Sequence, residues 1–416
     1  MFKNYLKIAW KVLLRHKLFT FISLFGISFT LLILVVITSF IDHTVGRETP
    51  ETRQNRILSV TYFRLTTPKG GNLVGPLVSY YFLDKYVRSL EIPERVTIGS
   101  FHKNIITYKD QKKFNFAMKY TDGEFWNIYD FKFIEGKGYS TNDVDQVNQV
   151  AVITADVRKK YFDDRTAVGK YIKMGEKNFR VIGVVDDVSL LRILPYSDVW
   201  VPITNSTANI MEPKIMTNEF PGYFATILAK DRNDIPQIKS EFQKHLSQVE
   251  FTEGRFDKIW GGAETYGETL SRVFVGGSKE PNLPGLMVIL FLLMLLFMIL
   301  PTINLININI SRIMERSSEI GVRKAFGASS KTLVGQFIIE NIAITLLGGT
   351  IAIILSLIVL SIINNSGIIP HLHLIMNWRI LYKSLLIAVF FGFLSGVYPA
   401  YKMSRLQPAE VLRGGE

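Results

Sequence analysis

Residues 312–335 read RIMERSSEIGVRKAFGASSKTLVG and form the most charged short stretch in the C-terminal third of the chain. Long uncharged runs precede and follow this stretch. Lys and Arg collect on the cytoplasmic side of membrane-spanning helices, so the basic charges here predict a cytoplasmic segment between two such helices. A basic loop that only fixes membrane topology and has no partner is the alternative interpretation.

The apolar runs on either side are long enough to cross a bilayer. About 20 helical residues span the ~30 Å hydrocarbon core. We therefore predict four transmembrane helices, at residues 18–41, 284–310, 332–363 and 380–400. The third exceeds the thickness of the core, so we expect it to begin in the cytoplasm. A soluble protein with four such core helices is the less favoured reading.

The distribution of charge predicts the topology. The chain of 416 residues has a net charge of +12, and most of the excess lies outside residues 42–283, beside the predicted helices. This pattern indicates membrane orientation, and we expect no nucleic-acid partner. Both termini are predicted to be cytoplasmic, with an amphipathic helix or a plain basic flank at 1–17 and a tail at 401–416. Residues 311–331 then form a cytoplasmic segment and residues 364–379 a short outer loop.

Residues 42–283 alternate between strand-like and helix-like patterns. Short β-branched runs such as 149–154 and 179–185 predict buried strands, and residues 56–65 are predicted to form another strand. An amphipathic helix is expected over about 235–246. The irregular alternation predicts a large α+β extracytoplasmic domain of two lobes, inserted between the first and second membrane helices.

Several residue groups could carry chemistry in this domain or near it. Adjacent carboxylates, at Asp163-Asp164 and Asp186-Asp187, could act as an acid–base pair, although solvated or capping roles are favoured. His371 and His373 could bind a metal, but no third ligand lies nearby in the sequence, so we expect no metal site. The aromatic group Phe125, Trp126 and Tyr129 is expected to pack in the core rather than to hold a ligand.

The chain shows no sequence signature of an ATPase. A phosphate-binding loop needs G-x-x-x-x-G-K-[ST], and residues 327–332, GASSKT, match only its ending because Ser330 occupies the second glycine position. We expect no enzymatic activity and no directly bound cofactor. There is no cysteine, so disulfides and thiolate metal sites are excluded.

Three segments together resemble the FtsX/MacB-like permeases of type VII ABC transporters. The first is SSEIGVRKAFGAS at 317–329, followed by QFIIEN at 336–341, which is similar to the family's inner-loop motif. The second is LSGVYPAYKMSRLQPAEVLR at 394–413, which resembles the family's C-terminal ending. The third, beginning DGEFWNIYDF at Asp122 and ending at Val188, resembles a MacB-type periplasmic core domain.

The resemblance implies a function for the charged segment. In the family a short coupling helix docks on the ATPase, and two permeases, identical or different, work with two ATPase copies that bind ATP and Mg²⁺. Because the fused ATPase of MacB is missing here, the resemblance implies an ATPase on a separate chain. The implied coupling residues are Glu315, Arg316, Glu319, Ile320, Gly321, Arg323, Lys324, Ala325, Gly327 and Ala328.

The resemblance also implies a location and possible activities. We expect a bacterial cytoplasmic (inner) membrane protein that exports or extracts antimicrobial peptides, drugs or lipoproteins, with a periplasmic adaptor and an outer-membrane channel as further partners. A mechanotransmission or signalling subunit that transports nothing is the alternative, and an enzyme tethered to the membrane is the third. Within the last membrane helix, the spacing of Gly392 and Gly396 predicts a face for close helix packing.

Overall fold

The computed structural model describes residues 17–75, 78–207, 209–217, 222–251, 256–275, 280–315, 322, 326, 329–379, 381–383, 385–387, 389–390, 392–393 and 397. The chain divides into two compact units, which are treated separately below. The helical unit comprises Met1–Asp42, Met287–Ser366 and Leu374–Glu416, and the α+β unit comprises His43–Leu286 and Gly367–His373.

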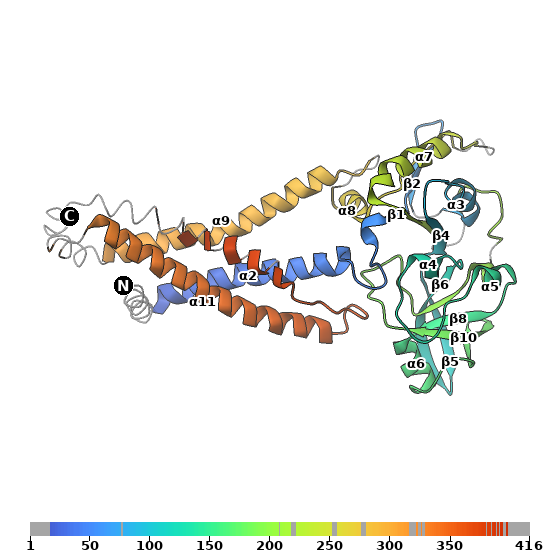
Figure 1. Cartoon of the computed structure of the whole chain (residues 1–416), viewed down its shortest axis with the longest axis horizontal. Helices are drawn as coiled ribbons and strands as arrows, with labels where there is room; N and C mark the ends of the chain where they lie inside the picture. Colours follow the sequence, from blue (N-terminus) through green and yellow to red (C-terminus); the bar gives the residue numbers. More distant parts are fainter. Residues whose placement is uncertain are drawn as a thin grey trace. The chain divides into compact units, whose positions relative to one another are not determined.

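The α+β unit is built on a mixed sheet that has ten strands among the described residues (Figure 1). The order is β1-β12-β4-β6-β11-β8-β10-β7, with β5 paired to β6 and β9 paired to β10. Only β6–β11 and β8–β10 run parallel. The strands are β1 (Ile57–Val60), β4 (Arg95–Ser100), β5 (Lys103–Lys109), β6 (Lys112–Thr121), β7 (Phe133–Gly136), β8 (Val150–Thr154), β9 (Tyr171–Met174), β10 (Lys177–Val185), β11 (Val199–Pro202) and β12 (Tyr223–Leu228).

A smaller sheet and short helices complete this unit. The second sheet has the order β13-β2-β3, with β2 at Phe63–Thr66, β3 at Asn72–Gly75 and β13 at Lys258–Gly261. The prediction of one strand over 56–65 is therefore wrong, because the chain leaves the large sheet after β1 and enters the small sheet as β2. The helices are α3 (Tyr80–Tyr86), α4 (Phe125–Ile128), α5 (Thr141–Asp145), α6 (Ala155–Phe162), α7 (Ile235–Ser247) and α8 (Tyr266–Val275).

Aromatic residues form much of the core of the α+β unit. Phe125 and Tyr129 are fully buried, and the Phe125 ring contacts those of Trp126 and Phe131. The Tyr129 hydroxyl lies 2.9 Å from the Thr226 hydroxyl, so its one polar atom is satisfied inside the core. The prediction that this aromatic group packs in the core is confirmed.

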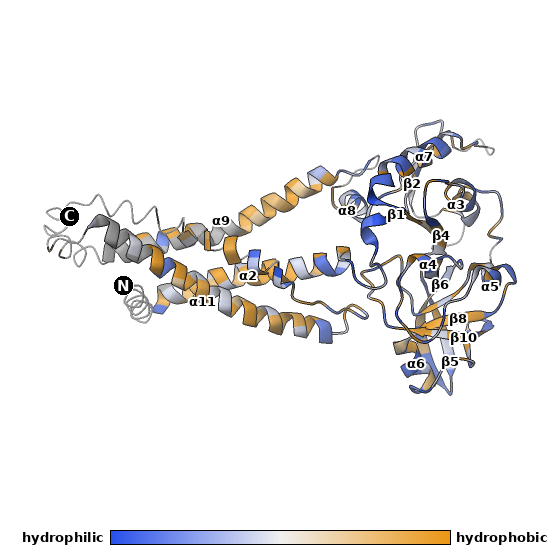
Figure 2. Cartoon of the chain, viewed as in Figure 1, coloured by the Kyte–Doolittle hydropathy of each residue, from blue (hydrophilic) through white to orange (hydrophobic). Residues whose placement is uncertain are grey.

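The helical unit contains three long helices among the described residues: α2 (Lys17–Val45), α9 (Leu283–Glu315) and α11 (Ser330–Asn365). Apolar residues dominate their coloured parts in Figure 2. By length and composition, Thr20–Val45 and Ile338–Asn365 could each cross a membrane, and Leu283–Phe297 is a shorter apolar stretch. The fourth predicted helix is described only in part, so the count of four spans stays a prediction.

One face of α2 packs against α11 and another remains exposed. Ile27 and Leu31 of α2 share a buried cluster with Ile344 and Ala352 of α11. On the exposed side, Phe21, Phe25 and Phe29 stack along the helix at four-residue spacing. An exposed row of three phenylalanines is unfavourable in water, whereas lipid chains would cover it.

Candidate functional site

The predicted coupling segment lies between two long helices. Glu315 is the last residue of α9, and α11 begins at Ser330. The other predicted coupling residues lie outside the described residues: Arg316, Glu319, Ile320, Gly321, Arg323, Lys324, Ala325, Gly327 and Ala328. Their role in coupling therefore stays a prediction.

Val322 and Phe326 are described within this segment. The Phe326 N–H donates to the Val322 carbonyl at 3.0 Å, which is the i to i−4 bond of an α-helical turn. Phe326 is 89% exposed, the highest exposure among the large apolar side chains that the structure describes. We did not select Phe326 from the sequence, although it is the only aromatic residue in 312–335 and that signal was available.

The helical unit contains close approaches at glycines of its helices. A Cβ atom added to Gly348 of α11 would lie 2.8 Å from Cγ2 of Ile27 in α2. Gly392, one of the two predicted packing residues, lies against Thr345 of α11, and a Cβ atom there would overlap the threonine hydroxyl. Gly396 lies outside the described residues. Such contacts let helix backbones come close together in lipid.

A buried ion pair lies in the α+β unit directly after α2. Arg192 Nη1 is 2.8 Å from Glu51 Oε2, and the two side chains are 2% and 5% exposed. Arg192 also donates to the Gly46 carbonyl at 3.1 Å. Burial raises the pKa of the Glu51 carboxyl, and the charge of Arg192 opposes that rise. The pair ties the segment that leaves α2 to the loop between β10 and β11.

A second buried cation supports the same loop. The Lys119 side chain is fully buried and donates to the carbonyl oxygens of Ile193 (3.1 Å) and Leu194. Its ammonium also lies 5.2 Å from the centre of the Phe224 ring. Burial lowers the pKa of Lys119 well below its usual range. Lys119 therefore holds two loop carbonyls that the sheet does not pair.

The α+β unit includes a short piece of chain from much later in the sequence. Gly367–His373 belongs to this unit, although the residues on both sides of it belong to the helical unit. The Leu190 N–H donates to the Pro370 carbonyl at 3.3 Å, and Leu372 is buried. These residues lie within the predicted outer loop, and the structure shows them docked rather than free.

His371 in this loop faces two carboxylates of the α+β unit. Its ring nitrogens lie 3.7 Å from Asp187 and 3.8 Å from Asp198, and the neighbouring cavity of about 330 Å³ is also lined by Asp156 and His102. Burial alone would lower the pKa of His371, but the carboxylates outweigh it and raise that pKa. The attachment is therefore strongest when the imidazole is protonated.

The other candidate groups have structural roles. Asp163 ends α6 in a left-handed conformation with φ of 53°. The Asp187 carboxylate accepts from the Asp156 N–H at 2.9 Å, and Asp186 pairs with Lys132 at 2.8 Å. Among the described residues, no group of three or more His, Cys, Asp or Glu side chains is placed to hold a metal ion.

Comparisons with known proteins match both units. Residues 20–245 match the MacB-like periplasmic core domain, and residues 289–408 match the FtsX-like permease C-terminal model. The uncharacterized ABC transporter permease YknZ of Bacillus subtilis (strain 168) is 23% identical over 289 residues, 70% of this chain and 68% of that protein. The macrolide export ATP-binding/permease protein MacB of Escherichia coli (strain K12) is 22% identical over 423 residues, 99% of this chain and 60% of that protein.

Among solved structures, the periplasmic region of MacB from Actinobacillus actinomycetemcomitans matches with 16% identity and a TM-score of 0.37, over 54% of this chain and 96% of that one. The chain spans about three fifths of the length of the MacB relatives that match nearly all of it. The core-domain match alone covers more than half of the chain. The chain therefore belongs to the FtsX/MacB-like family of ABC transporter permeases.

Proposed function

We propose that this chain is the permease subunit through which a separate ABC ATPase moves the α+β unit, for export or extraction of antimicrobial peptides, drugs or lipoproteins. The chain itself has no catalytic activity and binds no nucleotide; the ATPase binds ATP and Mg²⁺. Two permeases and two ATPase copies form the complex, in the inner membrane with both chain termini in the cytoplasm. A periplasmic adaptor and an outer-membrane channel complete an efflux pathway.

The observation that carries this proposal is the charged segment between α9 and α11. The helix of 33 residues that ends at Glu315 and the helix of 36 residues that begins at Ser330 can act as stiff levers on either side of it. Phe326 offers an exposed aromatic anchor of the kind that dominates binding energy at protein interfaces. The relative MacB is named as an ATP-binding/permease protein, and that name joins the two activities that the proposal assigns to two chains.

Three connections would carry motion into the α+β unit. The first is the segment after α2, which Arg192 and Glu51 hold by their buried ion pair. The second is α8, which precedes α9 in the chain and is held by the ion pair between Glu264 and Arg272. The third is the docked loop with His371. Rigid attachments of this kind suit mechanical transmission, whether the output is transport or the control of another protein.

The first test is purification of the full chain from its native membrane in mild conditions with trapped nucleotide, followed by mass spectrometry of the partners. Recovery of an ABC ATPase supports the proposal, and an adaptor protein beside it favours efflux. Recovery of the ATPase with an extracytoplasmic enzyme or sensor favours the signalling alternative. Repeated purification without any ATPase contradicts the coupling role.

Variants of the coupling segment test the contact itself. We expect Phe326→Ala to reduce ATPase recovery by about tenfold or more, because truncation of an interface anchor costs upwards of about 1.4–2 kcal/mol. Phe274→Ala is the matched control, since Phe274 is 71% exposed in the α+β unit.

Charge reversal by Glu319→Arg or Arg323→Glu should uncouple ATP hydrolysis from function without affecting membrane insertion. The control Lys132→Glu, at an exposed ion pair of the α+β unit, should leave ATP hydrolysis coupled to function. Equal effects of test and control variants would count against the assignment.

A further inference from the structure

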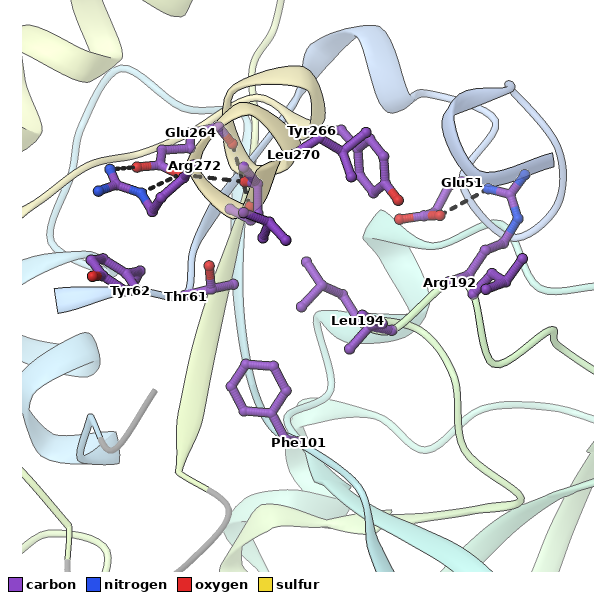
Figure 3. A pocket seen from close by; sticks show the side chains of 15 residues that line it. Glu51, Thr61, Tyr62, Phe101, Arg192, Leu194, Glu264, Tyr266, Leu270 and Arg272 are labelled. Atoms are coloured by element: carbon purple, nitrogen blue, oxygen red, sulfur yellow. Dashed lines mark hydrogen bonds and ion pairs between the residues drawn. The ribbon is translucent and has the colours of Figure 1, made fainter. Parts of the chain in front are cut away.

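The α+β unit contains a cavity of about 560 Å³ that the proposed function leaves without a role (Figure 3). Its walls come from the end of β1 and the residues after it, from the loop between β4 and β5, from residues 191–194 and from α8. Figure 3 shows Leu194, Leu270, Phe101 and Thr61 projecting toward one another around its centre. Ligand cavities that enclose drug-sized molecules commonly have volumes of about 300–1,000 Å³.

The charges around the cavity are already paired. On one side Glu264 and Arg272 form an ion pair, with side chains 5% and 9% exposed; on the other, Glu51 pairs with Arg192 (Figure 3). The Arg272 guanidinium also lies over the Tyr62 ring, 4.6 Å from its centre. A charged ligand would find no free counter-charge among these groups, and burying an unpaired charge is costly. The lining therefore selects against ions.

The cavity still offers hydroxyl groups to a polar atom of a ligand. Thr61 and Tyr266 both line it, and neither hydroxyl is hydrogen-bonded to any residue that the structure describes. Tyr266 points toward Glu51 in Figure 3, and burial is the main reason that its pKa rises to about 12. Its hydroxyl is therefore a neutral donor at physiological pH. An apolar lining with a few polar groups is the usual chemistry of a small-molecule site.

The rim of the cavity is apolar and open. Ile193 and Val273 line the cavity and are 54% and 70% exposed. Exposed apolar side chains next to an apolar cavity favour the entry of molecules that leave water readily. Seven residues join the end of α8 at Val275 to the start of α9 at Leu283, so Val275, two residues after the rim residue Val273, lies within about 29 Å of the start of an apolar helix.

We propose that this cavity binds an uncharged, mainly apolar molecule the size of a drug or of a single acyl chain, with Thr61 and Tyr266 as its hydrogen-bonding groups. Such a molecule can arrive from the outer leaflet of the bilayer or from solution. Its identification as the transported substrate rests on the proposed permease function, whereas binding itself does not. The test below therefore uses neither ATPase nor nucleotide.

The absence of cysteine makes a direct test possible, because a single introduced cysteine is the only thiol in the chain. Leu194→Cys and Ile193→Cys place that thiol in the cavity, and Phe274→Cys places it on the exposed side of the same helix as Val273. The full chain in lipid nanodiscs is labelled with a maleimide, with and without a probe. The probes are 1-monolauroylglycerol, an uncharged single-chain lipid, and 1-N-phenylnaphthylamine, an uncharged aromatic molecule.

We expect a probe at about ten times its dissociation constant to slow labelling about tenfold at the cavity positions. At that concentration only about a tenth of the sites are empty and open to the maleimide. Labelling at Phe274→Cys should change by less than about twofold. Protection by the lipid alone indicates the bilayer as the source, and protection by the aromatic probe alone indicates solution. Slowing at all three positions would mean general partition into lipid and would overturn the site, as would unchanged labelling at both cavity positions.

A blocking variant distinguishes binding in the cavity from a change of fold. Leu270→Trp fills the cavity and should abolish the protection of Ile193→Cys, while Phe274→Trp adds the same side chain to the same helix outside it. Protection that persists in the Leu270→Trp variant would overturn the proposal. Loss of ATPase recovery with intact protection would contradict the proposed function but leave this binding site standing.

Discussion

The two units hold their parts together by different means. In the helical unit, glycines allow side chains of a neighbouring helix to come into contact, as at Gly348 with Ile27 and at Gly392 with Thr345. In the α+β unit, buried charges such as Arg192 with Glu51 tie loops to the sheet region. Lipid tails are as apolar as helix side chains, so close packing rather than apolar burial must hold the helices. Water-exposed domains can use both apolar burial and paired charges.

The difference indicates where each unit is most sensitive to mutation. The α+β unit should lose most stability when one member of a buried ion pair is removed, because the remaining charge stays buried without a partner. The helical unit should lose most stability when a small residue at a helix contact is replaced by a large one, because the helix backbones must then separate. The predictions below run from the largest expected effect to the smallest.

The largest effect is expected from Arg192→Met, which leaves Glu51 buried without its partner. Breaking such a pair costs about 3–5 kcal/mol, so the free energy of unfolding of the α+β unit should fall by that amount. Denaturant unfolding of the full chain, followed by tryptophan fluorescence, measures this loss, because Trp200 is fully buried in the same unit.

The double variant Arg192→Met/Glu51→Met is the control for this prediction. It replaces both charges with apolar side chains and should recover most of the lost free energy, since exchanging a whole buried pair is often close to neutral. If the single variant is as stable as the original chain, or the double variant is less stable than the single one, the ion pair does not stabilise the α+β unit.

A smaller effect is expected in the helical unit from Gly348→Leu. The added side chain would force α2 and α11 apart at Ile27, and overpacking of this kind costs about 1–3 kcal/mol. The thermal unfolding of the helices in nanodiscs, followed by far-ultraviolet circular dichroism, reports the change. Gly335→Leu is the matched control, because it lies in the same helix with no atom within 4 Å of the added Cβ. If both variants behave alike, the glycine contact has no special role.

The smallest effect concerns the docked loop and depends on pH. Asp187 and Asp198 raise the pKa of His371. The stabilisation that protonated His371 gives to the docked loop is therefore fully present below the ordinary pKa of 6.5 and is lost as the pH rises through the raised pKa. Hydrogen exchange at the Leu190 N–H, corrected for the intrinsic rate at each pH, should therefore speed up as the pH rises through the raised pKa of His371.

The variant His371→Gln should remove this pH dependence, and His373→Gln, at an exposed histidine two residues away, should keep it. The remaining titratable groups at the site, Asp156, Lys160, Tyr196 and His102, stay in place in both variants. A pH dependence that is unchanged in His371→Gln would assign the effect to one of those groups instead.

Local patterns in the sequence were sufficient to predict much of the α+β unit. The β-branched run at 149–154 matches β8, and the amphipathic pattern at 235–246 matches α7, because burial periodicity acts over a few residues. The order of the strands and the split between β1 and β2 could not be predicted in this way. They depend on pairings between residues that are far apart in the sequence, such as Ser59 with Thr226.

The buried charges were missed for the same reason. Arg192 and Glu51 are separated by 141 positions, and Lys119 lies in a strand whose sequence gives no sign that its ammonium meets the carbonyls of residues 193 and 194. Charged residues are normally read as solvated, so nothing in the local pattern marks these as buried. The coupling residues were predicted from a resemblance, and all of them except Glu315 lie outside the residues that the structure describes.

The docked loop also affects the order of events during synthesis. The α+β unit takes residues 43–286 from one part of the chain and 367–373 from another, so it cannot be complete when residue 286 leaves the ribosome. The intervening 373 − 286 = 87 residues require roughly 4–17 s at the usual rates of translation. Throughout that interval the newly made domain keeps Asp187 and Asp198 without their histidine, and the unit is completed only when residues 367–373 have been made.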